Sequence, residues 1–371
     1  MSVSDISHQL ITDYRQLFIE DRPLVDLRAP AEFARGSFTQ AVSLPLMSDE
    51  ERAKVGTCYK YYGQQAAINL GHKLVSGQLK ADRLAAWAEF ARAHPNGALF
   101  CWRGGLRSQI TQQWLAEAGI DYPRIAGGYK ALRRFLIDEL ERLIADTPLV
   151  LLAGRTGCGK TELLVELKGT VDLEGLANHR GSSFGGQIEP QPTQIAFEND
   201  LSVNLLKQSQ HAPAAILLED ESGHIGSLML PQSLREKMAA APVVILETPF
   251  EQRVENIFDE YIRQRLAESI RYFGEKGFEH FSLYLRQSLY RIRRRLGMEG
   301  YQQLQQMMEQ ALASHQKGDP DAHREWITTL LRRYYDPMYD YQLGKKARHC
   351  LYAGQASEVA AFWHQQLHIT R

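Results

Sequence analysis

The fold of this chain follows from one stretch of its sequence: Pro148-Leu149-Val150-Leu151-Leu152-Ala153, directly continued by Gly154-Arg155-Thr156-Gly157-Cys158-Gly159-Lys160-Thr161. The first six residues are an apolar run that predicts a buried strand, and the next eight match the P-loop pattern G-x-x-x-x-G-K-[ST]. Glycines in such a loop let successive backbone N–H groups point at phosphate oxygens, and the helix that begins near Lys160 adds its positive end. We therefore expect the whole loop to bind phosphate, with Lys160 neutralising charge and Thr161 offering its hydroxyl to Mg²⁺.

Two further apolar runs, at 214–218 and 243–246, predict more strands of a nucleotide-kinase-like parallel sheet around this loop. Glu219 and Glu221 follow the first run, where an acidic partner would hold a metal-bound water; the alternative is a set of solvated acids at a strand end. Arg253, on the helix after the second run, would either reach a phosphate or lie on the surface.

A second anion-binding loop is predicted upstream, where the apolar residues 98–100 run into Cys101-Trp102-Arg103-Gly104-Gly105-Leu106-Arg107-Ser108. Cys101, Arg103 and Arg107 are the candidate catalytic residues, because guanidinium groups stabilise a thiolate and make it nucleophilic. Gly104, Gly105 and a helix beginning at Ser108 would complete the anion cradle. The alternative is a buried structural cysteine. The other cysteines, Cys58, Cys158 and Cys350, are expected to be inert.

Composition narrows the class of protein. The net charge of -1 argues against a chain that coats nucleic acid along its whole length, but it allows a local basic patch. No apolar run reaches the ~20 residues of a membrane span, and the start of the chain lacks a signal-peptide core. The four cysteines show no metal-ligand spacing, which argues against zinc, and scattered free thiols fit a cytoplasmic location.

Alternation of strands and helices predicts an α/β protein with parallel sheets. Helical periodicity covers about 49–75, 81–94 and 129–146, and the chain beyond Pro249 is expected to be nearly all helical. The predicted organisation is a parallel α/β domain at 1–130, a linker helix at 131–147, a P-loop kinase-like α/β domain at 148–260, and a helical, basic C-terminal region at 261–371.

Two other segments carry candidate binding residues. The polar, glycine-rich stretch 178–186 offers His179, Arg180, Ser182 and Ser183 to an acceptor substrate, unless it is a mobile surface loop.

The stretch 263–295 is rich in arginine and aromatic residues, with Leu285, Leu289, Ile292 and Leu296 as an inward stripe. The candidate RNA-binding residues there are Arg286, Arg291, Arg293, Arg294 and Arg295. The alternative is a charged helix face with its aromatics in the core.

These motifs together resemble a known family. Residues 24–28, Glu32-Phe33, Gly36 and the Cys101 loop, with Ala41, Pro45 and Gly127-Gly128, are similar to a rhodanese domain, which carries sulfur or selenium on its loop cysteine. A rhodanese-like domain followed by a P-loop, with the segments FCWRGGLRS and LANHRGSSFGG, resembles the tRNA 2-selenouridine synthase family over essentially the whole chain.

The resemblance implies replacement of sulfur by selenium in wobble 2-thiouridine of tRNA, with selenophosphate as donor. It also implies an S-geranyl intermediate made from geranyl diphosphate. Cys101 would then handle selenium, residues 154–161 would grip a diphosphate, and an enzyme that supplies selenophosphate would be a further partner. Whether ATP or geranyl diphosphate occupies the P-loop stays open.

Other classes of function also stay open. Cys101 and Arg107 satisfy C-x₅-R, the spacing of cysteine-dependent phosphatases, although Phe100 replaces the histidine usual before that cysteine. A rhodanese-fold phosphatase or sulfurtransferase with an ATP-binding P-loop domain is therefore the alternative. A non-catalytic RNA-binding module is a third option, disfavoured because both loops are intact.

Overall fold

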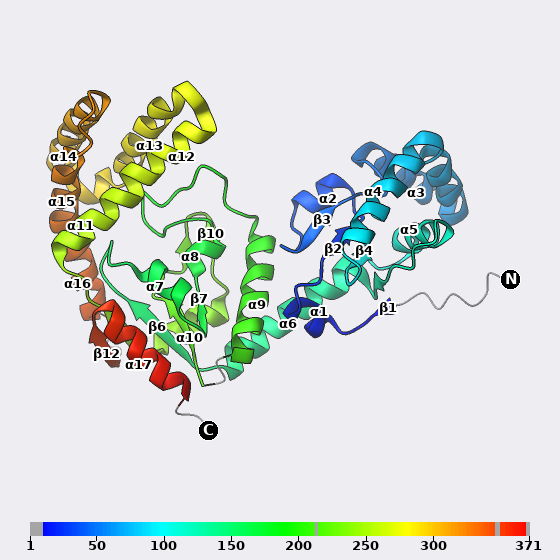
Figure 1. Cartoon of the computed structure of the whole chain (residues 1–371), viewed down its shortest axis with the longest axis horizontal. Coiled ribbons are helices and arrows are strands. Elements are labelled where there is room, and N and C mark those ends of the chain that lie inside the picture. Colours follow the sequence, from blue (N-terminus) through cyan, green and yellow to red (C-terminus); the bar gives the residue numbers. More distant parts are fainter. Residues whose placement is uncertain (1–9, 212–213, 346–348, 369–371) are drawn as a thin grey trace. The chain divides into compact units, whose positions relative to one another are not determined.

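The computed structural model describes residues 10–211, 214–345 and 349–368 (Figure 1). Its contacts divide the chain into two compact units. The N-terminal unit runs as far as Arg142 and also includes Pro192–Lys207, and the P-loop unit consists of Leu143–Gln191 and the chain from Gln208 onward. That Pro192–Lys207 packs with the N-terminal unit was not foreseen from the sequence, because no local signal separates it from the P-loop segment around it.

The N-terminal unit is built on a five-stranded sheet with the order β1-β5-β4-β2-β3 and every neighbouring pair parallel. Central strands of a parallel sheet are buried on both faces, and every residue of β2 and β4 is buried. The strands are β1 Leu10–Ile11, β2 Leu24–Asp26, β3 Ala41–Ser43, β4 Ala98–Phe100 and β5 Arg124–Ile125. The helices are α1 Tyr14–Ile19, α2 Pro30–Ala34, α3 Asp49–Leu74, α4 Gly77–Ala93, α5 Leu106–Glu117, α6 Gly128–Asp146 and α9 Gln194–His211.

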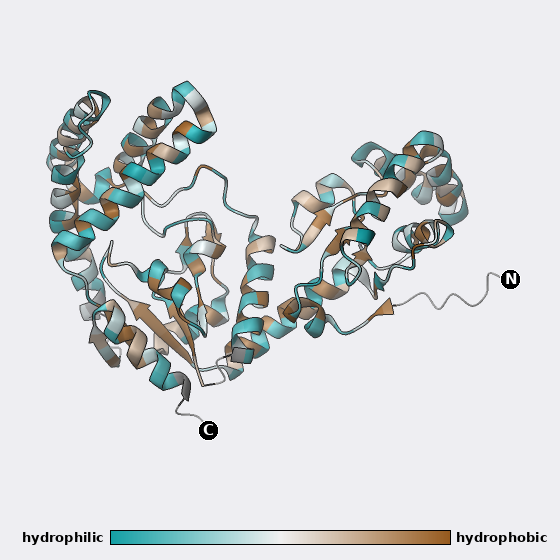
Figure 2. Cartoon of the chain, viewed as in Figure 1, coloured by the Kyte–Doolittle hydropathy of each residue, from teal (hydrophilic) through white to brown (hydrophobic). Residues whose placement is uncertain are grey.

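The P-loop unit contains a second parallel sheet, with the order β12-β11-β6-β8-β7. Its strands are β6 Leu149–Ala153, β7 Thr170–Val171, β8 Ile216–Glu219, β11 Val243–Leu246 and β12 Cys350–Gly354. The predicted strands are confirmed in β6, β8 and β11. The central strand β6 is buried throughout and is among the most apolar ribbons of the unit (Figure 2). The P-loop therefore emerges at the carboxyl edge of the sheet, where such sheets bind ligands.

The chain beyond Pro249 is nearly all helical, as predicted, and one strand interrupts the helices of its described residues. Strand β12 pairs in parallel with β11, and the helix after it, α17 Ala356–His368, packs Val359 and Trp363 into the core of this sheet. Half-exposed edge strands show little apolar patterning, and β12 acquires its partner only when the chain returns to the sheet.

Helices make up most of the rest of this unit, and those between Phe250 and Tyr335 share one core. The buried stripe predicted on the arginine-rich helix is confirmed at Leu285, Leu289 and Ile292. Two segments are π-helical, η1 Asp259–Gln264 and η3 Leu331–Tyr335. A small antiparallel hairpin joins β9 His224–Ile225 to β10 Leu228–Met229. The other helices are α7 Lys160–Glu166, α8 Leu173–Leu176, α10 Gln232–Ala240, α11 Phe250–Phe258, α12 Arg265–Phe273, η2 Gly274–Lys276, α13 Gly277–Arg291, α14 Arg293–Gln316, α15 His323–Leu330 and α16 Asp336–Lys345.

Among the helices that the structure describes, none is long and apolar enough to cross a membrane.

Candidate functional site

The P-loop lies between β6 and α7, and its glycines are required by its geometry. Gly157 and Gly159 have φ of 79° and 86°, which side chains rarely adopt. A β-carbon on Gly157 would also lie 2.8 Å from the backbone oxygen of Arg253, and one on Gly154 would lie 2.5 Å from the Cys158 sulfur. Glycine thus keeps the turn tight enough for its N–H groups to converge on a phosphate.

Side chains of α11 hold the loop from behind. The Arg253 Nε donates to the Thr156 oxygen at 2.9 Å, and the Asn256 amide donates to the Gly157 oxygen at 2.8 Å. Arg253 is buried and also pairs with Asp336, so it is neither a phosphate ligand nor a surface residue, and both expectations for it were wrong. Its guanidinium fixes the shape of the P-loop instead.

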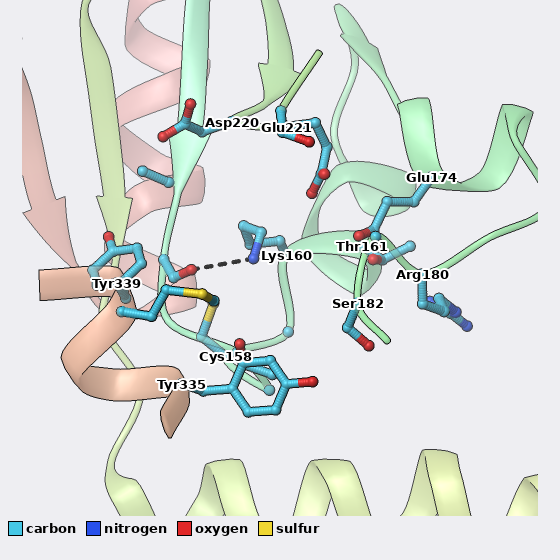
Figure 3. A pocket seen from close by; sticks show the side chains of 18 of the residues that line it. Cys158, Lys160, Thr161, Glu174, Arg180, Ser182, Asp220, Glu221, Tyr335 and Tyr339 are labelled. Carbon is cyan, nitrogen blue, oxygen red and sulfur yellow. Dashed lines mark hydrogen bonds between the residues drawn. The ribbon is translucent and has the colours of Figure 1, made fainter. Parts of the chain in front are cut away.

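Lys160 and Thr161 lie where the P-loop pattern predicts. The Lys160 ammonium donates to the Gly154 oxygen at 3.2 Å, inside the loop (Figure 3). Burial opposes its charge, but the neighbouring Cys158 and nearby glutamates outweigh burial and raise the pKa of Lys160. The Thr161 hydroxyl donates to Glu219 at 3.4 Å. Lys160 therefore carries a positive charge in a closed environment, where it is most effective toward an anion.

Three glutamates gather opposite Lys160. Glu219 is fully buried and accepts a hydrogen bond from the Glu174 backbone N–H at 2.9 Å, and the Glu174 and Glu221 carboxyls hydrogen-bond each other. Burial, followed by repulsion from Glu219 and Glu221, raises the pKa of Glu174, and burial, followed by repulsion from Asp172, raises the pKa of Glu219. Glu219 and Glu221 were predicted as the acidic partner; Glu174 was not singled out.

A cavity of about 380 Å³ opens above the P-loop. Of the predicted substrate-loop residues, Arg180 and Ser182 line it, whereas His179 and Ser183 do not. Arg180 pairs with Glu260 at 2.8 Å, and Ser183 donates to the Ser288 oxygen at 2.6 Å. The loop 178–186 is therefore split between the cavity wall and contacts to the helical region.

Four residues of the cavity wall were missed by sequence reasoning: Glu260, Tyr261, Tyr335 and Tyr339. The first two lie in the π-helical η1, and Tyr335 ends the π-helical η3. A π-helical turn contains an extra residue, so it shifts which side chains face inward, and such turns are frequent at functional sites. The signal that was available is a shift in phase of the apolar periodicity near 260 and 333.

The Cys101 loop joins β4 to α5 in the N-terminal unit. The cysteine is 3% exposed, and its sulfur lies 3.3 Å from the Ser108 hydroxyl. The Tyr129 N–H donates to the Cys101 oxygen at 2.8 Å, and a β-carbon on Gly128 would lie 2.2 Å from that oxygen. The helix begins at Leu106 with Gly105 before it, so its predicted start at Ser108 was two residues late.

The two arginines of this loop differ in their surroundings. The Arg107 guanidinium donates to Glu32 at 2.8 Å, and Arg52 pairs with the same carboxylate at 2.9 Å. Burial opposes ionisation of Glu32, but Arg107 lowers its pKa to about 2. Arg103 is exposed and makes no ion pair with any residue in the described ranges. Arg107 thus shares its charge with a carboxylate, while that of Arg103 is open to an anion.

A second cavity, about 480 Å³ in volume, lies beside this loop within the N-terminal unit. Arg103, Leu106 and Arg107 line one part of it, and Tyr59 and Ile68 of α3 line another. Its walls are mostly apolar, and its volume is in the range of small-molecule sites.

The predicted RNA-binding arginines do not share one environment. Arg286 pairs with Glu309 at 2.7 Å, Arg291 donates to the Ser183 oxygen at 3.2 Å, and Arg293 lies over the Tyr290 ring. Arg294 is exposed, and Arg295 lines the P-loop cavity. Arg286 and Arg291 flank an open groove with Tyr290 and Tyr301, whereas Phe281 is buried in the core.

The P-loop site offers few protein oxygens to a metal ion. Within the described ranges, no three His, Cys, Asp or Glu side chains are grouped as a complete metal site. Mg²⁺ usually takes only one or two protein oxygens, with water and substrate phosphates completing the shell. Thr161 and Glu219, whose oxygens lie 3.4 Å apart, fit that smaller demand.

The fold and the two loops define a class of protein: a P-loop phosphate-binding protein joined to an α/β unit that presents a cysteine on a glycine-rich turn. Residues 147–370 match the family model described as "tRNA 2-selenouridine synthase AAA domain". The chain belongs to the tRNA 2-selenouridine synthase family and is an enzyme.

Proteins that are similar to this chain over nearly their whole length have the same name. The tRNA 2-selenouridine synthase of Hahella chejuensis is 57% identical, with 95% of this chain and 93% of that protein covered. The corresponding protein of Pseudomonas fluorescens strain Pf0-1 is 54% identical, with coverage of 96% and 98%, and that of Cupriavidus pinatubonensis is 51% identical, with coverage of 94% and 96%.

Proposed function

We propose that this chain replaces sulfur by selenium in 2-thiouridine at the wobble position of tRNA, with selenophosphate as the selenium donor. The observation that carries the proposal is the similarity to tRNA 2-selenouridine synthases over both units, with the cysteine loop and the P-loop intact in one chain. Both loops can stabilise anions, as a reaction with two phosphorylated co-substrates requires.

The first step is alkylation of the 2-thiouridine sulfur by geranyl diphosphate at the P-loop. A bond forms between sulfur and the C1 carbon of the geranyl group, the C1–O bond breaks with its electron pair leaving on the diphosphate, and the N3 proton of the thiouridine passes to water. Backbone N–H groups of the loop and the Lys160 ammonium would stabilise that departing charge. Mg²⁺ held by Thr161 and Glu219 would supply further neutralisation.

A small apolar cavity lies beside the P-loop cavity. Its volume is about 20 Å³, it shares Tyr261 and Tyr335 with the P-loop cavity, and it is otherwise walled mainly by Phe184, Ile257 and Trp326. This volume is that of about one water molecule, so the assignment of geranyl diphosphate rather than ATP to the P-loop rests on the family resemblance.

The second step takes place at the Cys101 loop. Alkylation has turned the C2 sulfur into a leaving group, so selenium forms a bond to C2 as the C2–S bond breaks and geranylthiolate leaves. Water then adds to phosphorus, the Se–P bond breaks, and phosphate is released. We assign Cys101, Arg103 and Arg107 to this step, with the backbone N–H groups of the loop as anion donors, and the 480 Å³ cavity beside them would accept the alkyl group.

Other parts of the chain have supporting roles in this proposal. Arg180 and Ser182 would contact the acceptor at the P-loop cavity, with His179 and Ser183 shaping their loop. The groove of Arg286, Arg291, Tyr290 and Tyr301 would bind the tRNA backbone with Arg293 and Arg294. An enzyme that makes selenophosphate would supply the donor.

Nucleoside mass spectrometry tests the proposal. tRNA from cells that lack this chain should contain 2-thiouridine without 2-selenouridine, and return of the gene should restore 2-selenouridine. If the modification does not depend on the chain, and the purified protein instead releases phosphate from an aryl phosphate, the cysteine-dependent phosphatase reading replaces this one.

A further inference from the structure

Three tyrosines near the middle of α3 are exposed to solvent. Tyr59, Tyr61 and Tyr62 have exposed fractions of 59%, 68% and 78%, far above those of the other aromatics around the Cys101 loop, such as Trp102 at 39%. They form the last turn before Gly63, whose φ of 80° breaks the helix in two. The break presents this turn as a corner of the N-terminal unit.

No role in packing explains them. None of the three rings belongs to a buried cluster, and their hydroxyls have no hydrogen-bond partner among the residues that the structure describes. The Tyr61 and Tyr62 rings lie 6.5 Å apart, and the Lys60 ammonium lies 5.6 Å from the Tyr61 ring. Side chains that contribute little to the fold but expose large aromatic faces indicate a binding surface.

The position of this turn ties it to the Cys101 loop. Tyr59 lines the 480 Å³ cavity together with Arg103 and Arg107, which follow Cys101 in the loop. Tyr62, three residues on, is the helical neighbour of Tyr59, and the Tyr61 ring lies 6.5 Å from that of Tyr62. A molecule that brings a reacting atom to the Cys101 loop would therefore have its neighbouring groups beside these rings.

The chemistry of the turn favours unpaired nucleobases over a protein. The sequence Tyr59-Lys60-Tyr61-Tyr62 interleaves aromatic rings with a cation and contains no aliphatic side chain. Flat rings stack on bases of any sequence, and lysine attracts the phosphates between them. Tyrosines also occur in protein–protein interfaces, but lysine is depleted at the centre of such interfaces, whereas it fits a site for nucleic-acid phosphates.

We propose that Tyr61 and Tyr62, with Tyr59 and Lys60, stack the unpaired bases that flank the reacting nucleotide of the RNA substrate. This inference rests on the proposed function for the nature of that substrate. A base must leave its stack before a protein loop can reach its C2 atom, and its neighbours then lose stacking partners. Aromatic side chains replace those partners and hold the loop of RNA open.

Binding of a short hairpin RNA with the anticodon stem and loop tests the inference. Replacing both Tyr61 and Tyr62 by alanine in the full chain should weaken binding by roughly 10- to 100-fold, because each stacked base contributes substantially to affinity. Tyr61→Phe with Tyr62→Phe should bind as the unsubstituted chain does, since the rings remain. Tyr341→Ala, at a residue with a similar exposed fraction of 62%, is the matched control.

Two further readouts separate stacking from other effects. The slope of log affinity against log salt should not change in the alanine variant, because stacking releases no counterions. Abasic sites beside the reacting nucleotide should weaken binding to the unsubstituted chain and abolish its advantage over the alanine variant.

The outcomes are distinguishable. Unchanged affinity in the double alanine variant, or an equal loss in the phenylalanine or Tyr341 variants, would overturn the inference while leaving the proposed function intact. An unsubstituted chain that neither binds the hairpin nor modifies tRNA would contradict the proposed function itself.

Discussion

The two anion-binding loops of this protein share a plan but differ in how charge surrounds them. Each follows a buried parallel strand, turns through glycines and enters a helix. At the Cys101 loop, Glu32 pairs with both Arg107 and Arg52, and its carboxylate is held ionised. At the P-loop, Glu174 and Glu219 crowd around Lys160, and burial opposes their ionisation. The first loop therefore has surplus positive charge, since Glu32 faces two guanidinium groups and Arg103 is unpaired within the described part of the chain, whereas the second has surplus acid that a metal ion or a new hydrogen bond would relieve.

The difference suits the two proposed steps. A thiol that is 3% exposed, on a loop with surplus positive charge and beside a mostly apolar cavity, suits one reacting atom that carries an alkyl group. A 380 Å³ cavity with a lysine and several acids is built around a polyanion with its accompanying cation. Substitutions in the two loops should therefore have different chemical signatures.

The largest expected effect is from Cys101→Ser. Serine removes the soft sulfur that the proposal places beside the incoming selenium, so 2-selenouridine should fall below detection, while the alkylation step continues and S-geranylated tRNA accumulates. Nucleoside mass spectrometry of tRNA from cells expressing the variant measures both species. Cys350→Ser, at an exposed cysteine, is the control and should behave normally. Normal selenouridine in the Cys101 variant would remove this residue from the mechanism.

The second effect is from Lys160→Ala, which removes a charge-assisted contact of ~1.5–3 kcal/mol to the diphosphate. Geranyl diphosphate should bind roughly 10- to 100-fold more weakly, and both S-geranylated and selenated nucleosides should decrease. Calorimetric titration measures the affinity, and Lys168→Ala, on the exposed side of the same unit, is the control. Tight ATP binding that geranyl diphosphate fails to displace would make the P-loop a nucleotide site.

A third effect concerns RNA rather than either loop. Replacing Arg293, Arg294 and Arg295 by alanine should weaken tRNA binding and make the dependence of log affinity on log salt less steep, by up to ~2–3 units. Arg295 also lines the P-loop cavity, so Arg295→Ala alone distinguishes an effect on geranyl diphosphate from one on tRNA. Filter-binding titrations over a salt series provide the slope. If slope and affinity both stay unchanged, the tRNA backbone is bound elsewhere.

The smallest effects are on stability, and they should have opposite pH dependences at the two loops. Glu32 has a lowered pKa of about 2, so its ionised form stabilises the fold above the unfolded pKa near 4.5 and this contribution is lost as pH falls toward 2. Glu32→Gln should therefore lower the Tm at pH 7 and have progressively less effect in acid.

Glu174 should behave in the opposite sense. Its pKa is raised, so the folded state binds the proton more tightly, and stability decreases as pH rises above about 4.5. In the absence of ligand, Glu174→Gln should raise the Tm above that of the unsubstituted chain, and the increase should be larger at pH 8 than at pH 4. Scanning calorimetry across this range checks both variants, and parallel pH profiles for the two would contradict the contrast between the loops.

Sequence alone determined both loops and the strands that carry them. The P-loop and the Cys101 turn can each be predicted from a short continuous segment, because glycine conformations and strand-to-helix transitions are local properties. Strands β6 and β11 were predictable for the same reason: each is a continuous apolar run.

Tertiary structure decided how those loops are surrounded. Arg107 meets Glu32 across 75 residues of sequence, and Glu174 meets Glu219 across 45. The π-helical turns η1 and η3 direct Tyr261 and Tyr335 into the P-loop cavity, and the return of β12 completes the sheet. The ion pairs and the pairing of β12 leave no periodic trace in the sequence, since they depend on which segments the packed core brings together. The sequence thus specified the reactive groups, and the packing determined the charges, burial and partners that surround them.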